Sequence, residues 1–391
     1  MAVPKIRFPG FTEDWEQRKL GEFADIVTGK LDANAMKADG KYDFYTSGIQ
    51  KYRIDVPAFE GPAITIAGNG ATVGYMHLAD GKFNAYQRTY VLSSFKANRE
   101  FLFFEIGNKL PQKIAKEART GNIPYIVKDM LTDLVVSIPS ELEQKKIGAF
   151  FLNLDSLITL HQRKLESMKL LKKSLLQKMF PKSGETVPEV RFPGFTDAWE
   201  QRKLESLCIK FTDGDWIEAK DQSDSGVRLV QTGNVGVTEY LDKPNNKKWI
   251  SEETFNRLHC EEVLPGDILI SRLPEPAGRA CIMPALETKM ITAVDCTIVR
   301  TAPEINNKFL VQYLSSQSYF KEVNTCLAGG TRQRISRSNL ANFDIPVPTD
   351  KAEQDAIGEF LDNLDNLITL HQRKVEALQK LKKSLLQQMF V

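Results

Sequence analysis

The chain has 391 residues, of which 42% are hydrophobic and 26% are charged, which is the composition of a globular protein with room for two or three domains. No apolar run approaches the roughly 18–20 residues that a membrane span needs, and the N-terminal MAVPKIRFPG lacks a signal-peptide pattern. We therefore expect a soluble, cytoplasmic protein. The net charge of +2 says little about partners, although residues 183–350, with 19 basic and 24 acidic side chains, have a net charge of −5.

Two segments of different length are repeated along the chain. VPKIRFPGFTEDWEQRKL at 3–20 returns as VPEVRFPGFTDAWEQRKL at 187–204, and a longer segment at 143–180 returns at 353–390. Internal repeats fix an architecture before any single motif does. The order is a short repeat (the leader), a variable stretch and a long repeat, and then the same again.

The two variable stretches are predicted to be mixed α/β. In the first we expect strands near 63–67, 73–78 and 86–93, a helix across 100–116 and a closing strand at 134–139. In the second we expect strands near 229–231, 267–272, 279–283 and 294–300, a helix across 309–326 and a closing strand at 342–348. The shared order predicts one fold whose sequence has diverged.

The long repeat is predicted to be a helix, because it contains no proline and only one glycine near its start. Positions spaced alternately four and three apart are mostly apolar, the pattern of a coiled coil. In the first copy they are Leu154, Ile158, His161, Leu165, Met168, Lys172, Leu175 and Met179. Thirty-eight residues would form a rod of about 57 Å. Leu157, Leu160, Leu171 and Leu176 widen the stripe and predict a second buried face.

The first long helix is predicted to end before Pro181, and the polar link 182–187 is short. The two long helices would then pack antiparallel. The expected fold class is α+β, with two diverged mixed α/β domains separated by two long antiparallel coiled-coil helices in a pseudo-two-fold arrangement. The expected boundaries are 1–140 for the first domain, 141–182 for the first helix, 183–350 for the second domain and 351–391 for the second helix.

Catalytic motifs were not found. The sequence has no HExxH, no phosphate-binding GxxxxGK[ST], no GxSxG and no CxxC, and its five cysteines are widely spaced. His161 and His371 lie at positions of the long repeat that are spaced alternately four and three apart, which form the seam of a coiled coil. This placement favours a structural role. AGNGATVG at 67–74 predicts a tight turn, with close approach to phosphates as the alternative. We expect no enzyme, no cofactor and no metal.

Two similar domains on a rod suit double-stranded DNA, whose half-sites are read about 34 Å apart by dimeric proteins. Arginine suits guanine, asparagine and glutamine suit adenine, and lysine suits phosphate, although any such side chain could simply be solvated. The candidates in the first domain are Asn69, Gln87, Arg88, Arg119, Asn122, Tyr125 and Lys128. Those in the second are Gln231, Asn234, Arg272, Arg279, Arg332, Gln333, Arg334 and Arg337, the last four on the loop GGTRQRISRS.

The duplicated order of motifs closely resembles the specificity (S) subunit of type I restriction–modification systems, over essentially the whole chain. The motifs are the FPGF…WEQRKL leaders at 8–20 and 192–204, the closing strands with IP or VP, the EQxxIGxF starts at 143–150 and 353–360, and the LDxLITLHQRK helices. The resemblance implies a non-catalytic subunit whose variable stretches are target-recognition domains for a bipartite, gapped DNA site. It also implies that the helices form the spacer and dock two methyltransferase subunits, which recruit motor–nuclease subunits.

Two other hypotheses remain open at this stage. The chain could be a protein-binding adaptor whose two domains grip different partners on a coiled-coil spacer. The salt dependence of binding distinguishes this hypothesis from DNA binding. Affinity for DNA falls steeply as the salt concentration rises, because binding releases counterions. An enzyme with an unrecognised site is the third reading, and it would require the isolated chain to bind adenosylmethionine or cut DNA.

Overall fold

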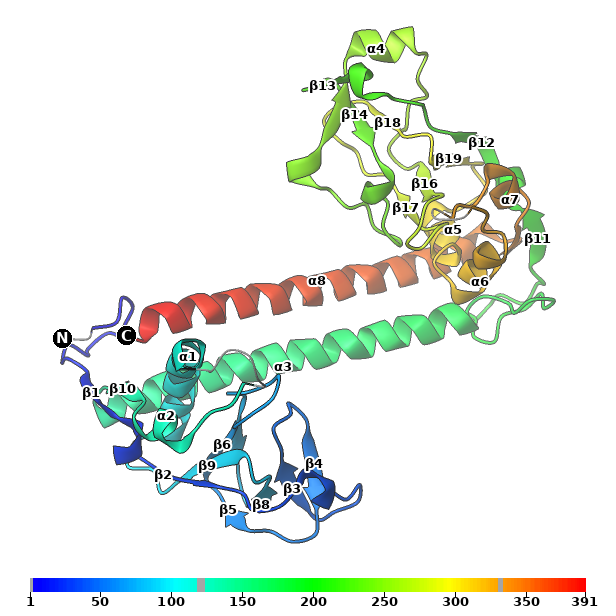
Figure 1. The fold of residues 1–391 in the computed structure, drawn as a ribbon. Coiled ribbons are helices and arrows are strands. Elements are labelled where there is room, and N and C mark those ends of the chain that lie inside the picture. The colour runs from blue at the N-terminus through cyan, green and yellow to red at the C-terminus, as the bar shows by residue number, and fades with distance from the viewer. Residues whose placement is uncertain (1–2, 118–123, 330–332) are drawn as a thin grey trace. The chain divides into compact units, whose positions relative to one another are not determined.

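A computed structural model describes residues 3–117, 124–329 and 333–391. The chain divides into two compact units, of which the first is Met1–Gln162 with Arg373–Val391 and the second is Arg163–Gln372. Each unit therefore contains one variable stretch together with a part of both long repeats (Figure 1).

The first unit contains two four-stranded sheets and one short strand pair. One sheet is antiparallel in the order β2 (Asp25–Thr28), β9 (Thr89–Ser93), β6 (Ala63–Ala67) and β7 (Met76–Ala79). The other has the order β4 (Lys51–Ile54), β3 (Tyr42–Tyr45), β8 (Lys82–Ala85) and β5 (Phe59–Glu60), with β3 and β8 parallel. The leader strand β1 (Glu16–Lys19) pairs with the closing strand β10 (Val135–Ile138).

The helices of the first unit pack on the buried side of the first sheet. They are α1 (Arg99–Glu117) and α2 (Lys128–Thr132), with short 3-10 turns η1 (Leu20–Glu22) and η2 (Ala33–Ala35). One hydrophobic core joins the sheet, α1 and the long helices, and it includes Ile64, Leu92, Phe101 and Phe151, all fully buried.

The second unit repeats this order. Its first sheet runs β12 (Cys208–Asp213), β19 (Cys296–Thr301), β16 (Ile268–Ser271) and β17 (Ala280–Ile282), and its second runs β13 (Gln222–Ser223), β15 (Lys248–Ile250), β14 (Val227–Val230) and β18 (Met290–Thr292). The strand pair is β11 (Glu200–Lys203) with β20 (Asp344–Val347). The helices are α4 (Glu252–Arg257), α5 (Asn307–Tyr313), α6 (Gln317–Thr325) and α7 (Arg337–Ala341), with 3-10 turns η3 (Leu204–Leu207), η4 (Ala219–Asp221), η5 (Thr232–Asn234) and η6 (Pro244–Asn246).

The predicted mixed fold is confirmed, and the differences from prediction are local. The strand expected at 73–78 begins only at Met76, because the chain first turns through Gly74, whose φ of +83° favours glycine. The single helix expected at 309–326 is two helices. Ser316 caps the second one by accepting a hydrogen bond from the Tyr319 amide, which starts a new helix where the first has ended.

The long helices are α3 (Glu141–Lys178) and α8 (Lys351–Met389), as predicted. In the first unit, Lys382 Nζ lies 2.5 Å from Asp155 Oδ1, and the Phe151 and Phe390 rings are 5.6 Å apart. Residue numbers rise on one helix as they fall on the other, so the predicted antiparallel packing is confirmed within this unit. The second unit repeats the ion pair between Lys172 and Asp365, at 2.5 Å.

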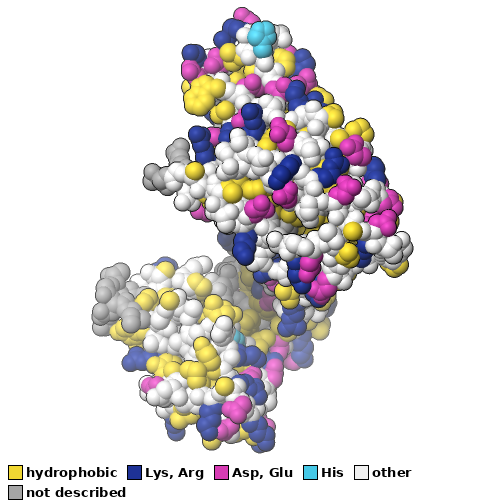
Figure 2. Space-filling model, turned by 90° about the vertical axis from the view of Figure 1, so that its right-hand side faces the viewer, with side chains coloured by type: hydrophobic (Ala, Val, Ile, Leu, Met, Phe, Trp, Pro, Cys, Tyr) yellow, Lys and Arg dark blue, Asp and Glu magenta, His cyan; other side chains and the backbone are white. Residues whose placement is uncertain are grey.

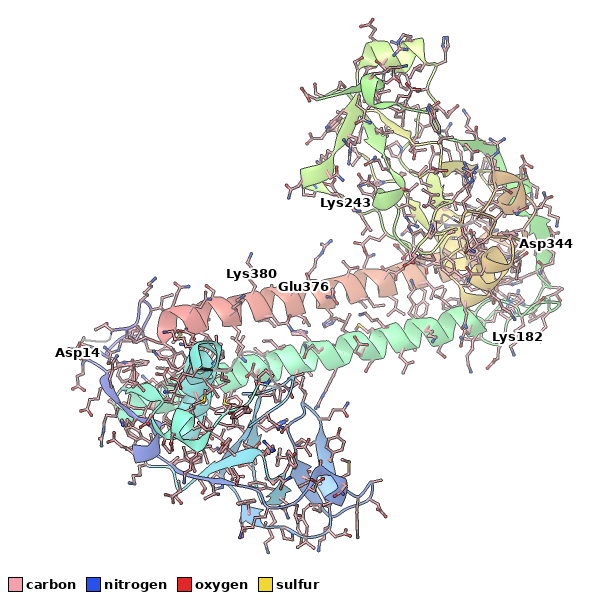
Figure 3. The ribbon with its side chains drawn as sticks, viewed as in Figure 1. Asp14, Lys182, Lys243, Asp344, Glu376 and Lys380 are labelled. Carbon is pink, nitrogen blue, oxygen red and sulfur yellow. The ribbon has the colours of Figure 1, made fainter. Side chains whose placement is uncertain are left out.

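The predicted second buried face on the long helices was wrong for three of its four leucines. Leu157, Leu160 and Leu171 of α3 are 46%, 58% and 50% exposed, and only Leu176 is half-buried. Their counterparts on α8, Leu367, Leu370 and Leu381, are 44%, 46% and 49% exposed. The seam positions are already filled by the other long helix, so these leucines remain on the surface. Glu376 and Lys380 also project from the exposed side of α8 (Figure 3).

Each leader is fixed to the start of a long helix by a buried ion pair. Arg7 Nε and Nη2 donate to the two carboxylate oxygens of Glu143, at 2.7 and 2.8 Å. Arg191 donates in the same way to Glu353, at 2.6 and 2.8 Å. The Glu143 and Glu353 side chains are 0% and 1% exposed. The sequence identity of the leaders therefore has a structural reason, which is to hold the first strand against α3 or α8.

Candidate nucleic-acid interface

Three of the segments predicted to contact DNA in the first unit meet at one edge, where backbone hydrogen bonds join them. The Gly68 amide donates to the Arg88 carbonyl at 2.8 Å, and the Ile126 amide donates to the Gly68 carbonyl at 2.8 Å. Asn69 and Tyr125 form an isolated β-bridge. The glycine loop, the turn between β8 and β9 and the loop before α2 are thus held together without side chains.

The second unit builds the same edge from different residues. The Arg272 amide donates to the Asp295 carbonyl at 2.9 Å, and the Ile335 amide donates to the Arg272 carbonyl at 3.1 Å. These two bonds match those of Gly68, so position 272 corresponds to 68, 295 to 88 and 335 to 126. We call this shared set of backbone hydrogen bonds the edge frame. By the same correspondence, Arg334 and Arg337 occupy the places of Tyr125 and Lys128.

A glycine follows the first strand of the first sheet in both units, β2 and β12, and the close approach of the neighbouring backbone requires it. A Cβ on Gly29 would lie 1.9 Å from the Ala85 carbonyl oxygen, and one on Gly214 would lie 2.3 Å from that of Thr292. Both glycine amides donate to the start of the neighbouring strand, at 3.1 Å to Thr89 and 2.9 Å to Cys296. The close approach fixes where the next residues emerge.

On the first unit's edge, most of the described candidates are exposed. Gln87, Arg88, Tyr125 and Lys128 are exposed, and Gln87 Nε2 donates to Asp32 at 3.4 Å. Asn69 is half-buried, and its Oδ1 accepts a hydrogen bond from Ser47 Oγ at 2.6 Å. Arg119 and Asn122 lie outside the described residues. The Tyr90 hydroxyl donates to the Ile126 carbonyl at 2.9 Å, and burial raises the pKa of Tyr90, so it stays a donor at neutral pH.

On the second unit's edge, the exposed candidates are arginines held loosely by acids. The Arg334 and Arg337 side chains are 62% and 46% exposed. Arg334 Nη1 lies 3.7 Å from Asp295 Oδ1, and Arg337 Nη1 lies 3.7 Å from Asp213 Oδ2. Gln333 is exposed, and Arg332 lies outside the described residues. Two of the acidic side chains that give this domain its net negative charge, Asp295 and Asp213, therefore lie directly beside its predicted base-reading arginines.

Arg279 is a structural residue and not a contact, which corrects the prediction. It is 8% exposed, and its guanidinium donates to the carbonyls of Val235, Thr232 and Leu273 at 2.6, 2.8 and 2.7 Å. Burial lowers its pKa, and these carbonyls compensate together with that of Pro276, which accepts from Nη1 at 2.9 Å. Its donors join two loops and are not free for a base.

Asn234 and Arg272 are likewise turned inward, and Gln231 is partly so. Asn234 is 2% exposed. Its Oδ1 accepts a hydrogen bond from the Gln231 amide, and its Nδ2 donates one to the Leu241 carbonyl. Arg272 is 8% exposed and donates to the Val294 carbonyl at 2.6 Å. Gln231 is half-buried at the start of the same turn. Asn234 and Arg272 are therefore excluded from the proposed interface, since duplex DNA cannot reach them in this conformation.

Two further features belong to the edge: a loop of which only the second unit's copy, with Gln231, was among the predicted contacts, and an exposed tryptophan that was not predicted. The loop Thr46-Ser47-Gly48 follows β3 as Gln231-Thr232-Gly233 follows β14, and the Tyr86 and Ala293 amides donate to the strand ends in the same way. Trp216 is 71% exposed just beyond Gly214. The TSG and QTG triplets were a weak signal in the sequence, whereas the exposure of a tryptophan depends on the fold.

The face drawn in Figure 2 does not present one basic patch. On the face in Figure 2, lysine and arginine side chains are interspersed with aspartate and glutamate. Among the described residues no group of three or more histidine, cysteine, aspartate or glutamate side chains could hold a metal ion, and no helix there is long and apolar enough to cross a membrane.

Comparison with known proteins agrees with this architecture. A family model described as the type I restriction modification DNA specificity domain matches residues 12–170 and 196–380. The chain is 27% identical to the EcoDI specificity subunit of Escherichia coli, over 86% of this chain and 78% of that protein. It is 23% identical to the MjaVIII specificity subunit of Methanocaldococcus jannaschii, over 96% of this chain and 91% of that protein.

Solved structures share the fold. The type I restriction–modification S subunit from M. genitalium superposes with a TM-score of 0.65 at 16% identity, covering 100% of this chain and 99% of that one. A chain from another type I system superposes with a TM-score of 0.51 at 18% identity, covering 96% and 97%. With the family model matching both halves, the chain belongs to the type I restriction–modification specificity family, whose members recognise DNA targets and are not catalytic.

Proposed function

We propose that this chain reads a bipartite DNA target with a fixed gap and carries the methyltransferase subunits to it in the cytoplasm. The domain at about 21–138 reads one half-site and the domain at about 205–347 reads the other. The helices α3 and α8 set the gap. Two methyltransferase chains dock on the exposed leucines of these helices and recruit the motor–nuclease subunits.

The observation that carries this proposal is the edge frame. One set of backbone hydrogen bonds supports Arg88, Tyr125 and Lys128 in the first unit, and Asp295, Arg334 and Arg337 in the second. A shared frame with different exposed side chains is what two domains need to read two different sequences by base-edge contacts.

Base-modification sequencing tests the proposal directly. DNA is taken from cells that express a cognate methyltransferase subunit with and without this chain. A new methylated motif in two parts with a fixed gap is expected only when the chain is present. If the complex assembles and no new motif appears, the DNA-reading function is refuted.

Arg334→Ala is expected to relax one base position in the half-site read by the second domain, at a cost of about 1–3 kcal/mol in discrimination. Arg334 is exposed on the edge, so its loss removes donors from the interface without opening the core. The modified motif of the variant is compared with that of the parent. Equal relaxation of both half-sites would argue against base reading by this residue.

Removing one heptad from both α3 and α8 is expected to shorten the tolerated gap. Seven helical residues span about 10 Å, the length of about three base pairs. The two deletions must be made together, because the seam pairs one helix with the other. The motif of the deleted protein gives the new gap, and an unchanged gap would refute the ruler role of the helices.

A protein-binding adaptor is the second candidate function. The exposed leucines of the long helices favour binding to a protein partner, which this function requires. Leu157 and Leu160, with their counterparts Leu367 and Leu370, are 44–58% exposed. Such residues suit a protein interface under either reading. Binding of the assembled complex to DNA at rising salt separates the readings, because only DNA binding should weaken steeply.

A further inference from the structure

Two acids on the second unit's edge are placed against its exposed arginines. Asp213 ends β12, and its Oδ1 accepts a hydrogen bond from Thr297 Oγ1 at 3.0 Å. Its Oδ2 lies 3.4 Å from Arg272 Nη2 and 3.7 Å from Arg337 Nη1. The buried Arg272 and the strand residue Thr297 thus hold Asp213 in place, and Asp213 in turn faces the exposed Arg337.

Asp295 faces Arg334 in the same manner. Its side chain is 29% exposed, and its Oδ1 lies 3.7 Å from Arg334 Nη1. The Asp295 carbonyl accepts the Arg272 amide at 2.9 Å, so the edge frame fixes the backbone that carries the acid. The Arg334 backbone is fixed too, by two hydrogen bonds with Ala328 at 2.9 and 3.0 Å.

Among the described residues, each of these guanidinium groups has an acid near one Nη. The distance is 3.7 Å for both Arg334 and Arg337, which exceeds that of a close bidentate pair. Arginine has five N–H donors in a planar fork, and reading of guanine O6 and N7 uses two of them. An acid that holds one side of the fork therefore turns the other side outward.

The first unit has neither acid. Thr28 stands at the frame position of Asp213, since Thr28 pairs with Tyr90 as Asp213 pairs with Thr297. Arg88 stands at the position of Asp295, and Tyr125 at that of Arg334. The acids thus accompany the arginines and are not part of the frame itself.

We propose that Asp213 and Asp295 are positioning residues, which aim Arg337 and Arg334 at guanines in the half-site read by the second unit. Their negative charge also lowers affinity for DNA that offers no guanine there, because an acid near the backbone repels phosphate. This inference rests on the proposed function and adds the base class and the residues that select it.

The test uses the complex of the full chain with its cognate methyltransferase subunits, and compares Asp295→Asn with Arg334→Ala. Both variants are expected to relax the same guanine position, each by roughly tenfold. Asp213→Asn and Arg337→Ala should share a second position. Binding to an unrelated duplex should strengthen severalfold in the two asparagine variants and weaken in the two alanine variants, because the former remove a negative charge and the latter a positive one.

Two controls separate positioning from a general effect. Asp224→Asn removes the same charge from an exposed turn after β13, and it should change neither guanine preference. Asp295→Glu keeps the charge and should retain most of the preference that Asp295→Asn loses. Thermal unfolding of each variant shows whether the fold is kept.

The possible outcomes are distinct. An unchanged guanine preference in both asparagine variants overturns the inference. So does relaxation by Asp295→Asn at a position other than the one relaxed by Arg334→Ala, or equal relaxation in the first half-site. A parent complex with no sequence preference at all would instead refute the proposed function.

Discussion

Replacing Arg191 with alanine is expected to lower the free energy of unfolding by about 3–5 kcal/mol. The Glu353 carboxylate is 1% exposed and receives both of its short ion-pair hydrogen bonds from Arg191. The variant leaves this charge buried without its cation, which is far more costly than losing the pair as a whole. Urea unfolding, followed by circular dichroism, measures the change.

The chain offers matched variants for this prediction. Arg7→Ala should destabilise the first unit by a similar amount, because Glu143 is 0% exposed. Lys178→Ala breaks an ion pair with Glu189 whose side chains are 46% and 49% exposed, and it should cost under about 1 kcal/mol. If Arg191→Ala lowers the free energy of unfolding no more than Lys178→Ala does, the ion pair between the leader and the long helix does not stabilise the fold. The double replacement of Arg191 and Glu353 by methionine should cost less than Arg191→Ala.

Glu105→Gln is expected to stabilise the protein at pH 8 and to have little effect at pH 5. Glu105 lies on α1 with 0% exposure, and burial raises the pKa of its carboxyl from 4.5 to about 7. The folded protein therefore binds a proton that the unfolded chain releases between these values. The contribution of the carboxyl to stability is complete below pH 4.5 and is lost as pH rises through 7.

The expected gain at pH 8 is at most about 3 kcal/mol, from a pKa difference of roughly 2.5 units. The glutamine oxygen can still accept the Ser137 amide, which donates to Glu105 Oε1 at 2.8 Å. Thermal unfolding of parent and variant at pH 5 and pH 8 measures the effect. Glu117→Gln, at the exposed end of α1, is the control. A stability difference that does not change with pH would contradict the assignment to ionisation.

The second unit has no ionisable carboxyl at the position that corresponds to Glu105. Tyr313 stands where Glu105 stands, because each lies four residues after a phenylalanine, Phe309 or Phe101, whose amide lies beside the equivalent glycine of a long helix. Pro346 stands where Ser137 stands, since they pair with Gln201 and Gln17. Proline has no amide to satisfy, so no buried acceptor is needed there. Burial raises the pKa of Tyr313 and keeps it neutral. A corresponding pH effect is therefore expected only in the first unit.

The long helices could be predicted because a heptad period sustained over 38 residues is a strong local signal. Apart from β14, which overlaps the strand expected near 229–231, the strands of the second sheet in each unit were missed, because they are two to four residues long and carry no clear alternation. At the level of loops, the segments that carry the candidates are joined by backbone hydrogen bonds within each unit: the glycine loop, the β8–β9 turn and the loop before α2 in the first, and Arg272, Asp295 and the loop before α7 in the second. Which side chains face outward was not predictable, because the burial of Arg279 depends on the carbonyls of Thr232 and Val235, more than 40 residues away.

The edge frame has an evolutionary consequence, because its hydrogen bonds join backbone groups that every residue except proline can supply. A single codon change at Arg88, Tyr125, Arg334 or Arg337 alters an exposed side chain and leaves the frame bonds in place. Mutational drift at these positions therefore carries little folding penalty, whereas drift at Gly29, Gly214 or Arg279 meets a steric or buried-polar barrier. On the proposed function, a lineage of such chains would acquire new DNA targets one substitution at a time and stay folded throughout.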